Sequence, residues 1–331
     1  MLKLAVIGTS MICQQFIEAT LKTGDYNLKA LYSRSKEKAS DFLGELSQVE
    51  VFDDLESFVQ YDEIDVVYIA SPNSLHYYQA KAALNAGKHI IVEKPAFSNP
   101  REFSEISNLA KEKGLYVLEA ARHIHDQAFK VVKDFLSDKK ILGATLTYAK
   151  YSSKMPALLA GELPNKWNPK FSGGILSDLG VYLVYWSLGQ FGQPEQVDYS
   201  AQILESGVDV SGIGILRYPT FDVNFFVAGN LNSYLPSEVY TEKGTLILDS
   251  VAGTTCAEFV SINGEKESLE IFPSAQLLFD EAKVFAQVIE NREEESYENY
   301  IQLAKSVNQY LYDMRKKVEV QFEADEDKLF L

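Results

Sequence analysis

The first 120 residues alternate apolar, strand-like runs with helical stretches, and this alternation constrains the fold more than any other feature. Uninterrupted apolar runs are typical of strands that are buried on both faces of a parallel sheet. Three of the helical stretches end near a glycine, a residue that commonly terminates helices. We therefore predict an α/β amino-terminal domain, residues 1–121, built on a doubly wound parallel sheet. Its expected strands are Leu2–Ile7, Asn27–Tyr32, Val66–Ala70, Ile90–Val92 and Tyr116–Glu119.

The pattern changes after Arg122, where strand-like runs follow one another with few helices between them. Short connections favour antiparallel pairing, because parallel neighbours need long crossovers. We predict that residues 122–331 form an α+β domain with a large, open, mainly antiparallel sheet. Its expected strands are Gly143–Tyr151, Gln196–Leu204, Val210–Tyr218, Asp222–Ala228, Glu238–Tyr240, Thr245–Asp249, Ala257–Ile262 and Ser268–Ile271, and its helices are Asp126–Leu136, Phe171–Leu188, Ser274–Asn291 and Ser296–Lys316.

Composition and charge exclude several classes of function. The net charge of -16 argues against binding to nucleic acid or anionic lipid, because both require a basic surface. No apolar run is long enough to span a bilayer, and the first residues do not resemble a signal peptide, so we expect a cytoplasmic protein without membrane contact. Two cysteines cannot build a disulfide framework, and the four histidines form no familiar ligand pattern. We predict no metal.

The turn after the first strand carries a weakened glycine fingerprint. Gly8-Thr9-Ser10-Met11-Ile12-Cys13 keeps the first glycine of the dinucleotide-binding motif of Rossmann folds, with small residues at the other two positions. Gly8 would permit the tight turn, and Ser10 is small enough for a pyrophosphate to approach the backbone. The amides of Ser10, Met11 and Ile12 would then lie at the positive end of the next helix. The alternative is an ordinary strand-to-helix turn.

The second strand ends in Ser33 and Arg34, with Lys38 nearby, where an NAD-selective site would be expected to have a carboxylate. Arginine can bind a 2'-phosphate through two parallel hydrogen bonds. This pattern favours NADP, with NAD as the second choice. The alternative is a solvated, charged helix start.

Two further turns follow strands at the same expected edge of the sheet. Ser71-Pro72-Asn73 comes after the third strand, and His76 lies in the first turn of the next helix, either facing the ligand crevice or serving as a capping or core histidine. Glu93-Lys94-Pro95 comes after the fourth strand. Because Pro95 biases Lys94 towards an extended backbone, the ammonium should point into the crevice. Lys94 is the leading catalytic candidate, and a surface lysine is the alternative.

Four blocks in order resemble the glucose-fructose oxidoreductase / inositol dehydrogenase / MocA family over essentially the whole chain. They are Gly8-Thr9-Ser10, Ala70-Ser71-Pro72-Asn73-Ser74-Leu75-His76, the run Ala86 to Pro95, and Ser172-Gly173-Gly174 through Asp178-x-Gly180-x-Tyr182. The resemblance implies a nicotinamide-dependent oxidoreductase in which Lys94 lies beside the nicotinamide and the substrate oxygen, with Glu93 next to it. It also implies that Asp178 and Tyr182 line the facing wall. Many members carry histidine at the last position, whereas the branch of glucose-fructose oxidoreductase and dihydrodiol dehydrogenase has tyrosine.

The expected reaction transfers a hydride between the nicotinamide and a carbinol or carbonyl carbon of a sugar, polyol or diol bound between the domains. Tyr182 would exchange the proton, Lys94 would stabilise the alkoxide, and Asp178 would orient the lysine or a substrate hydroxyl. A phenol has an ordinary pKa of about 10, so it needs a cation nearby to act as a base.

Further assignments concern the substrate and the assembly. We assign Arg122 and Trp167 to the substrate, with a core tryptophan as the alternative for Trp167. A homodimer or dimer of dimers is expected through the open sheet, with Phe225, Val227 and Leu246 on its exposed face. The alternative function is a silent dinucleotide-binding sensor of the same fold.

Overall fold

The computed structural model describes residues 1–44, 46 and 48–326. The chain divides into two compact units. The first contains residues 1–122 and 274–305, and the second contains residues 123–273 and continues from residue 306. The division falls inside the long helix α10 (Glu294–Lys317), so the carboxy-terminal segment contributes to both units. Among the residues described, no helix is long and apolar enough to cross a membrane.

The first unit contains a six-stranded sheet in the order β3-β2-β1-β4-β5-β6, with every neighbouring pair parallel. The order reverses between β1 and β4, as it does in doubly wound sheets that bind ligands at this point. The predicted Rossmann fold is therefore confirmed. The short edge strand β3 was not predicted, because three residues, one exposed and two half-buried, leave little pattern. The strands are β1 (Leu2–Ile7), β2 (Tyr26–Tyr32), β3 (Glu50–Phe52), β4 (Val66–Ile69), β5 (His89–Glu93) and β6 (Val117–Ala120).

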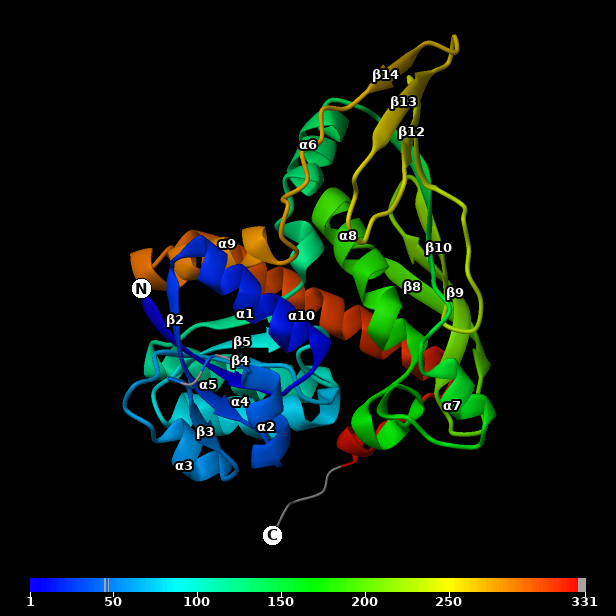
Figure 1. Ribbon diagram of the computed structural model, residues 1–331. Coiled ribbons are helices and arrows are strands. Elements are labelled where there is room, and N and C mark those ends of the chain that lie inside the picture. Colours follow the sequence, from blue (N-terminus) through cyan, green and yellow to red (C-terminus); the bar gives the residue numbers. More distant parts are fainter. Residues whose placement is uncertain (45, 47, 327–331) are drawn as a thin grey trace. The chain divides into compact units, whose positions relative to one another are not determined.

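Helices cover both faces of this sheet. Right-handed crossovers place the helices after β1 and β2 on one face and those after β3, β4 and β5 on the other. Contacts between α1 and α9, and between α4 and both α3 and α5, agree with this division. Tyr26 donates a hydrogen bond to the carbonyl oxygen of Ala282 at 2.7 Å, which joins α9 to the start of β2 (Figure 1). The helices are α1 (Met11–Thr23), α2 (Lys36–Leu43), α3 (Leu55–Val59), α4 (His76–Asn85), α5 (Pro100–Lys113) and α9 (Phe279–Asn291).

The second unit contains an eight-stranded sheet in the order β14-β13-β12-β11-β7-β10-β9-β8. All neighbouring pairs are antiparallel except β7 and β10, which are parallel, so the prediction of a mainly antiparallel sheet is confirmed. Helix α8 runs along one face of the sheet (Figure 1). The elements are α6 (Gln127–Leu136), β7 (Ile141–Ala149), α7 (Met155–Leu159), α8 (Val181–Phe191), β8 (Gln196–Ile203), β9 (Asp209–Arg217), β10 (Asp222–Ala228), β11 (Ser237–Thr241), β12 (Gly244–Leu248), β13 (Ala257–Ser261) and β14 (Lys266–Ser268).

One prediction about this sheet was wrong. Phe225, Val227 and Leu246 were assigned to its exposed face, but all three are buried. Side chains alternate between the faces of a strand, so the neighbouring positions point the other way. Ile213, which pairs with Phe226, is 56% exposed and lies on the open face. The open face is therefore the one that carries Ile213 and Phe226.

Candidate active site

Gly8 closes the turn between β1 and α1. Its φ is 120°, and a Cβ at this position would lie 2.9 Å from the carbonyl oxygen of Ala70. Only glycine therefore lets the carboxyl ends of β1 and β4 come this close. Ser10 precedes the helix in an extended conformation without a side-chain cap, and no acidic residue lies in the first turn. The positive end of α1 is thus suited to an anion that approaches the backbone of Ser10 and Met11.

The end of β2 carries an exposed arginine. Ser33 accepts a hydrogen bond from the Ser35 amide at 3.3 Å, and Ser35 in turn caps α2 by accepting one from the Lys38 amide. Lys36 forms an ion pair with Asp53 at 3.2 Å. Within residues 1–44, 46 and 48–326, Arg34 has no ion pair, and its side chain is exposed. It is therefore available to an anionic group at this edge.

His76 is fully buried. Its Nε2 lies 2.8 Å from the carbonyl oxygen of Ser71, and its Nδ1 lies 3.1 Å from that of Ala96. Burial lowers the pKa of His76, which favours the neutral ring. The histidine joins the loop after β4 to the loop after β5, so it supports the turn of Ser71, Pro72 and Asn73 rather than presenting a nitrogen to a ligand. The core alternative describes it better.

Glu93 is the last residue of β5, and Lys94 follows it. Tyr68 on β4 donates a hydrogen bond to Glu93 Oε1 at 2.5 Å, and its ring stacks on Phe16 with the centroids 3.8 Å apart. Burial raises the pKa of Glu93, while the neighbouring charge of Lys94 and, more weakly, that of Arg122 oppose this rise. Tyr68 thus fixes the carboxylate, and the charges of Lys94 and Arg122 favour its ionised form. Lys94 is partly exposed, and its bond to Pro95 is cis.

In the second unit, Gly173 and Gly174 let the loop at Lys166 pack against the backbone that precedes Asp178. A Cβ at Gly173 would overlap the carbonyl oxygen of Lys166, and the amide of Gly174 donates a hydrogen bond to that oxygen at 2.8 Å. The Lys166 side chain returns to form an ion pair with Asp178. Lys166 was not predicted, because a lysine before a tryptophan carries no recognisable signal and only the folded turn brings it to the carboxylate.

Asp178 lies in a π-helical turn, Leu176–Gly180, and Tyr182 follows in the first turn of α8. π-Turns of this kind occur frequently at functional sites. The Tyr182 ring lies 4.8 Å from that of His123 and 5.6 Å from that of Tyr148, and His123 Nε2 lies 3.1 Å from the Tyr182 carbonyl oxygen. Neither of these neighbours was predicted as part of the site. The unit thus brings Lys166, Asp178, Tyr182, Tyr148 and His123 to one end of α8.

Trp167 is fully buried. A Cβ at Gly229 would lie 2.5 Å from its ring and 2.8 Å from Ile175, so the indole packs against backbone in the core. The core alternative therefore describes Trp167 better than a side chain that contacts the substrate.

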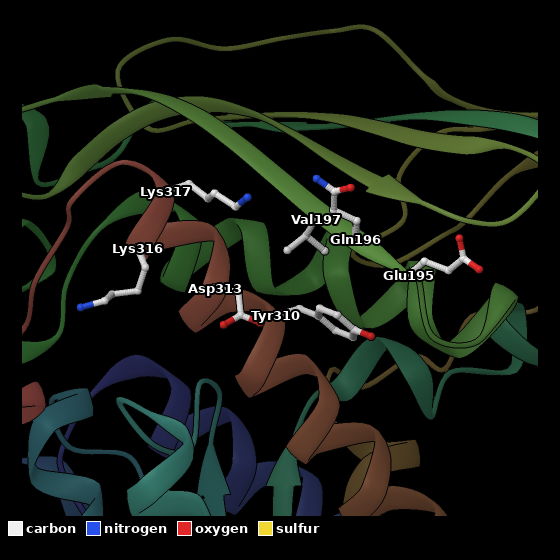
Figure 2. A pocket seen from close by; sticks show the side chains of 7 residues that line it. All are labelled: Glu195, Gln196, Val197, Tyr310, Asp313, Lys316 and Lys317. Atoms are coloured by element: carbon white, nitrogen blue, oxygen red, sulfur yellow. The ribbon is translucent and has the colours of Figure 1, made fainter.

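A groove of about 370 Å³ lies between the end of α10 and the start of β8 (Figure 2), and it contains none of the predicted site residues. Tyr310 donates a hydrogen bond to the Pro194 carbonyl oxygen, and Lys317 pairs with Asp198 at 3.5 Å. These polar groups are already engaged within the protein. The groove is lined by Glu195, Gln196, Val197, Tyr310, Asp313, Lys316 and Lys317.

Comparison with known proteins agrees with this arrangement. Residues 2–120 match the family described as "Oxidoreductase family, NAD-binding Rossmann fold", and residues 129–247 match the "GFO/IDH/MocA C-terminal domain". The chain is 34% identical to a scyllo-inositol 2-dehydrogenase (NADP(+)) of Bacillus subtilis, over 98% of this chain and 100% of that protein. It is 23% identical to the mouse trans-1,2-dihydrobenzene-1,2-diol dehydrogenase over 80% of this chain and 79% of that protein.

Solved structures share the fold. A 3-ketoreductase from Actinomadura kijaniata, in complex with NADP and TDP-benzene, has a TM-score of 0.84 at 19% identity and covers 96% of this chain and 97% of its own. The family matches and the full-length relative at 34% identity together leave one conclusion: the chain belongs to the Gfo/Idh/MocA family of oxidoreductases, whose amino-terminal domain is an NAD-binding Rossmann fold.

Proposed function

We propose that the protein is an NADP-dependent dehydrogenase or reductase that acts on a CH–OH group of a sugar, polyol or diol. The observation that carries this proposal is the environment of Lys94. The lysine follows a strand of the Rossmann sheet at the ligand-binding edge, next to a carboxylate that Tyr68 holds in place. In this scheme residues 1–121 bind the dinucleotide, and residues 122–331 bind the substrate.

The residues of the first unit fit a dinucleotide. Gly8 has the positive φ and close approach that the fingerprint requires, and the first turn of α1 has no competing side-chain cap. We assign the pyrophosphate to Gly8, Thr9, Ser10, Met11 and Ile12. When bound, the nicotinamide supplies or accepts the hydride.

Selection of NADP is assigned to the end of β2. Arg34 is exposed, and its guanidinium would bind the 2'-phosphate in bidentate fashion, with Ser33 and Lys38 beside it. The names of relatives that use NADP(+) support this choice.

The proton and the developing charge are assigned to side chains of both units. We propose that Tyr182 gives its proton to the substrate oxygen during reduction and that the Lys94 ammonium stabilises the alkoxide; oxidation is the reverse. Asp178, held by Lys166, orients a substrate hydroxyl. The pair of Lys166 and Asp178 offers a donor beside an acceptor, which suits neighbouring hydroxyl groups. This is the support within the chain for a polyol, and relatives that act on scyllo-inositol and on a dihydrodiol agree with it.

The proposal is tested with a panel of cyclic polyols, sugars and vicinal diols, assayed in both directions with NADP(H) and NAD(H). Turnover of at least one neutral polyhydroxy compound with NADP(H) is the expected result. The competing function is a dinucleotide-binding sensor. NADPH binding in a fluorescence titration, without turnover of any compound in the panel, would favour the sensor and remove the proposed activity.

We also propose that the protein forms a homodimer through the open face of the second sheet. Ile213 is 56% exposed there, and Phe226 lies opposite it on the neighbouring strand. An exposed apolar face of a large sheet is costly in water, so burial against a second copy would stabilise it.

A further inference from the structure

Asp209, the first residue of β9, is a buried carboxylate that belongs to no sequence motif. It is 3% exposed, and its Oδ2 accepts hydrogen bonds from the Tyr199 hydroxyl at 2.7 Å and from the Leu176 amide at 2.8 Å. The amide of Ile175 contributes a further hydrogen bond, which favours the charged form, although burial raises the pKa of Asp209. Burial of a carboxylate costs free energy, and these donors offset part of that cost.

The two amide donors, those of Ile175 and Leu176, lie at the start of the π-turn. The residue that precedes this turn, Ile175, provides no side-chain cap, yet the first amides of a helix need acceptors. Ile175 and Leu176 are both buried, so water cannot substitute readily. Asp209 supplies the missing acceptor from a strand that lies 33 residues away in sequence. The orientation of the turn is therefore set by a tertiary contact rather than by a local cap.

Glycine at position 174 makes this contact possible. Gly174 has a φ of 120°, and a Cβ there would overlap Asp209 Oδ1. Tyr199, which donates to Asp209 Oδ2, packs against Gly212 on β9, where a Cβ would overlap the tyrosine ring. Two glycines thus leave room for a tyrosine and an aspartate at the base of the turn.

We propose that Asp209 is a positioning residue that fixes the π-turn so that Asp178 and Tyr182 are held in reactive geometry. Asp178 lies inside the turn and Tyr182 directly after it, so a shift at Leu176 moves both. This inference rests on the roles proposed above for Asp178 and Tyr182. It adds that the acid/base groups depend on a buried acceptor outside the substrate site.

The test compares the wild type with Asp209→Asn and with Tyr199→Phe, a milder variant that removes the hydroxyl donor to Asp209 Oδ2 and so loosens the carboxylate that accepts the Leu176 amide. Asp209→Asn should lower kcat about tenfold to a hundredfold, because displacement of reacting groups by about 1 Å has effects of this size. KM for NADP(H) should not change, since the residues assigned to the cofactor belong to the first unit. Tyr199→Phe should show a clearly smaller loss.

Amide hydrogen exchange of the cofactor-free protein gives a readout besides activity. Asp209→Asn should accelerate exchange across residues 174–182 while the parallel sheet keeps its protection. A purely structural role would lower Tm without lowering kcat at temperatures where the variant is folded. That result, or unchanged exchange at 174–182, would overturn the inference. If Asp209→Asn does not fold, the exchange comparison on Tyr199→Phe decides, with faster exchange expected and unchanged exchange contradictory.

A failure of the proposed function can be distinguished from a failure of the inference about Asp209. If Tyr182→Phe and Lys94→Ala both retain wild-type turnover, the proposed roles fail. The exchange comparison would still decide whether Asp209 fixes the turn.

Discussion

Replacement of Lys166 by methionine tests how much the ion pair to Asp178 contributes to the reaction. Methionine keeps an unbranched, apolar side chain against Trp167, whose ring lies 5.0 Å from the ammonium, but it removes the charge. The backbone contact between Lys166 and Gly174 does not involve the side chain, so the loop should stay in place. The substitution therefore isolates the effect of the cation on Asp178.

The expected loss of activity in Lys166→Met depends on how far the ion pair of Lys166 and Asp178 is exposed to water. A hydrogen bond to a charged group contributes about 1.5–3 kcal/mol. The side chains of Lys166 and Asp178 are 21% and 36% exposed, so water replaces part of the lost interaction, and the lower end of this range applies. A loss of about 1.4 kcal/mol in transition-state stabilisation corresponds to about a tenfold fall in kcat/KM.

The assay is steady-state turnover of the best polyol at saturating NADP(H), with Lys170→Ala as the control. Lys170 is an exposed lysine of the same loop without an ion pair in the described part of the chain. The control should match the wild type, and both variants should bind NADPH normally. Wild-type kcat/KM in Lys166→Met would refute the role given to the ion pair.

Three further results are expected. Arg34→Ala should raise KM for NADPH about tenfold and leave that for NADH nearly unchanged, because only NADPH has the 2'-phosphate; equal effects on both would contradict the assignment. Burial lowers the pKa of His125 to about 3, so its contribution to stability is complete above the unfolded value of about 6.5 and is lost as pH falls towards 3. Urea unfolding should therefore show a shallower loss of stability below pH 6.5 in His125→Phe, and an unchanged slope would count against this. Ile213→Asp should shift the protein from dimer to monomer in sedimentation velocity, whereas a dimer of unchanged affinity would exclude this face as the interface.

Local signals explain which parts of the fold were predictable. Helix α5 carries such signals, because Asn99 caps it, Pro100 starts it and Gly114 ends it with a φ of 66°. Each of these signals acts within a turn of its own residue. The sheet faces were not predictable in the same way. Phe225 and Phe226 are equally apolar, and only the packing of α8 and its neighbours decides which of them is buried.

The residues of the candidate site were likewise predictable only where a local motif contains them. Gly8, Lys94, Asp178 and Tyr182 were predicted as site residues because each belongs to a motif with fixed spacing. Lys166 and Asp209 were missed because their partners lie at distant positions and meet only in the folded turn. His76 was recognised as part of a motif, yet its burial between two carbonyl oxygens depends on the packing of two loops.

The central claim is that Lys94 carries the chemistry of a nicotinamide-dependent oxidoreductase. Its most direct test is turnover of Lys94→Ala, measured beside NADPH binding, with Lys111→Ala on the exposed side of α5 as the control. We predict that kcat of Lys94→Ala falls about 10²–10³-fold, the usual effect of losing one group that stabilises a developing oxyanion. NADPH affinity should change little. Wild-type turnover in Lys94→Ala, with the cofactor bound normally, would contradict the account.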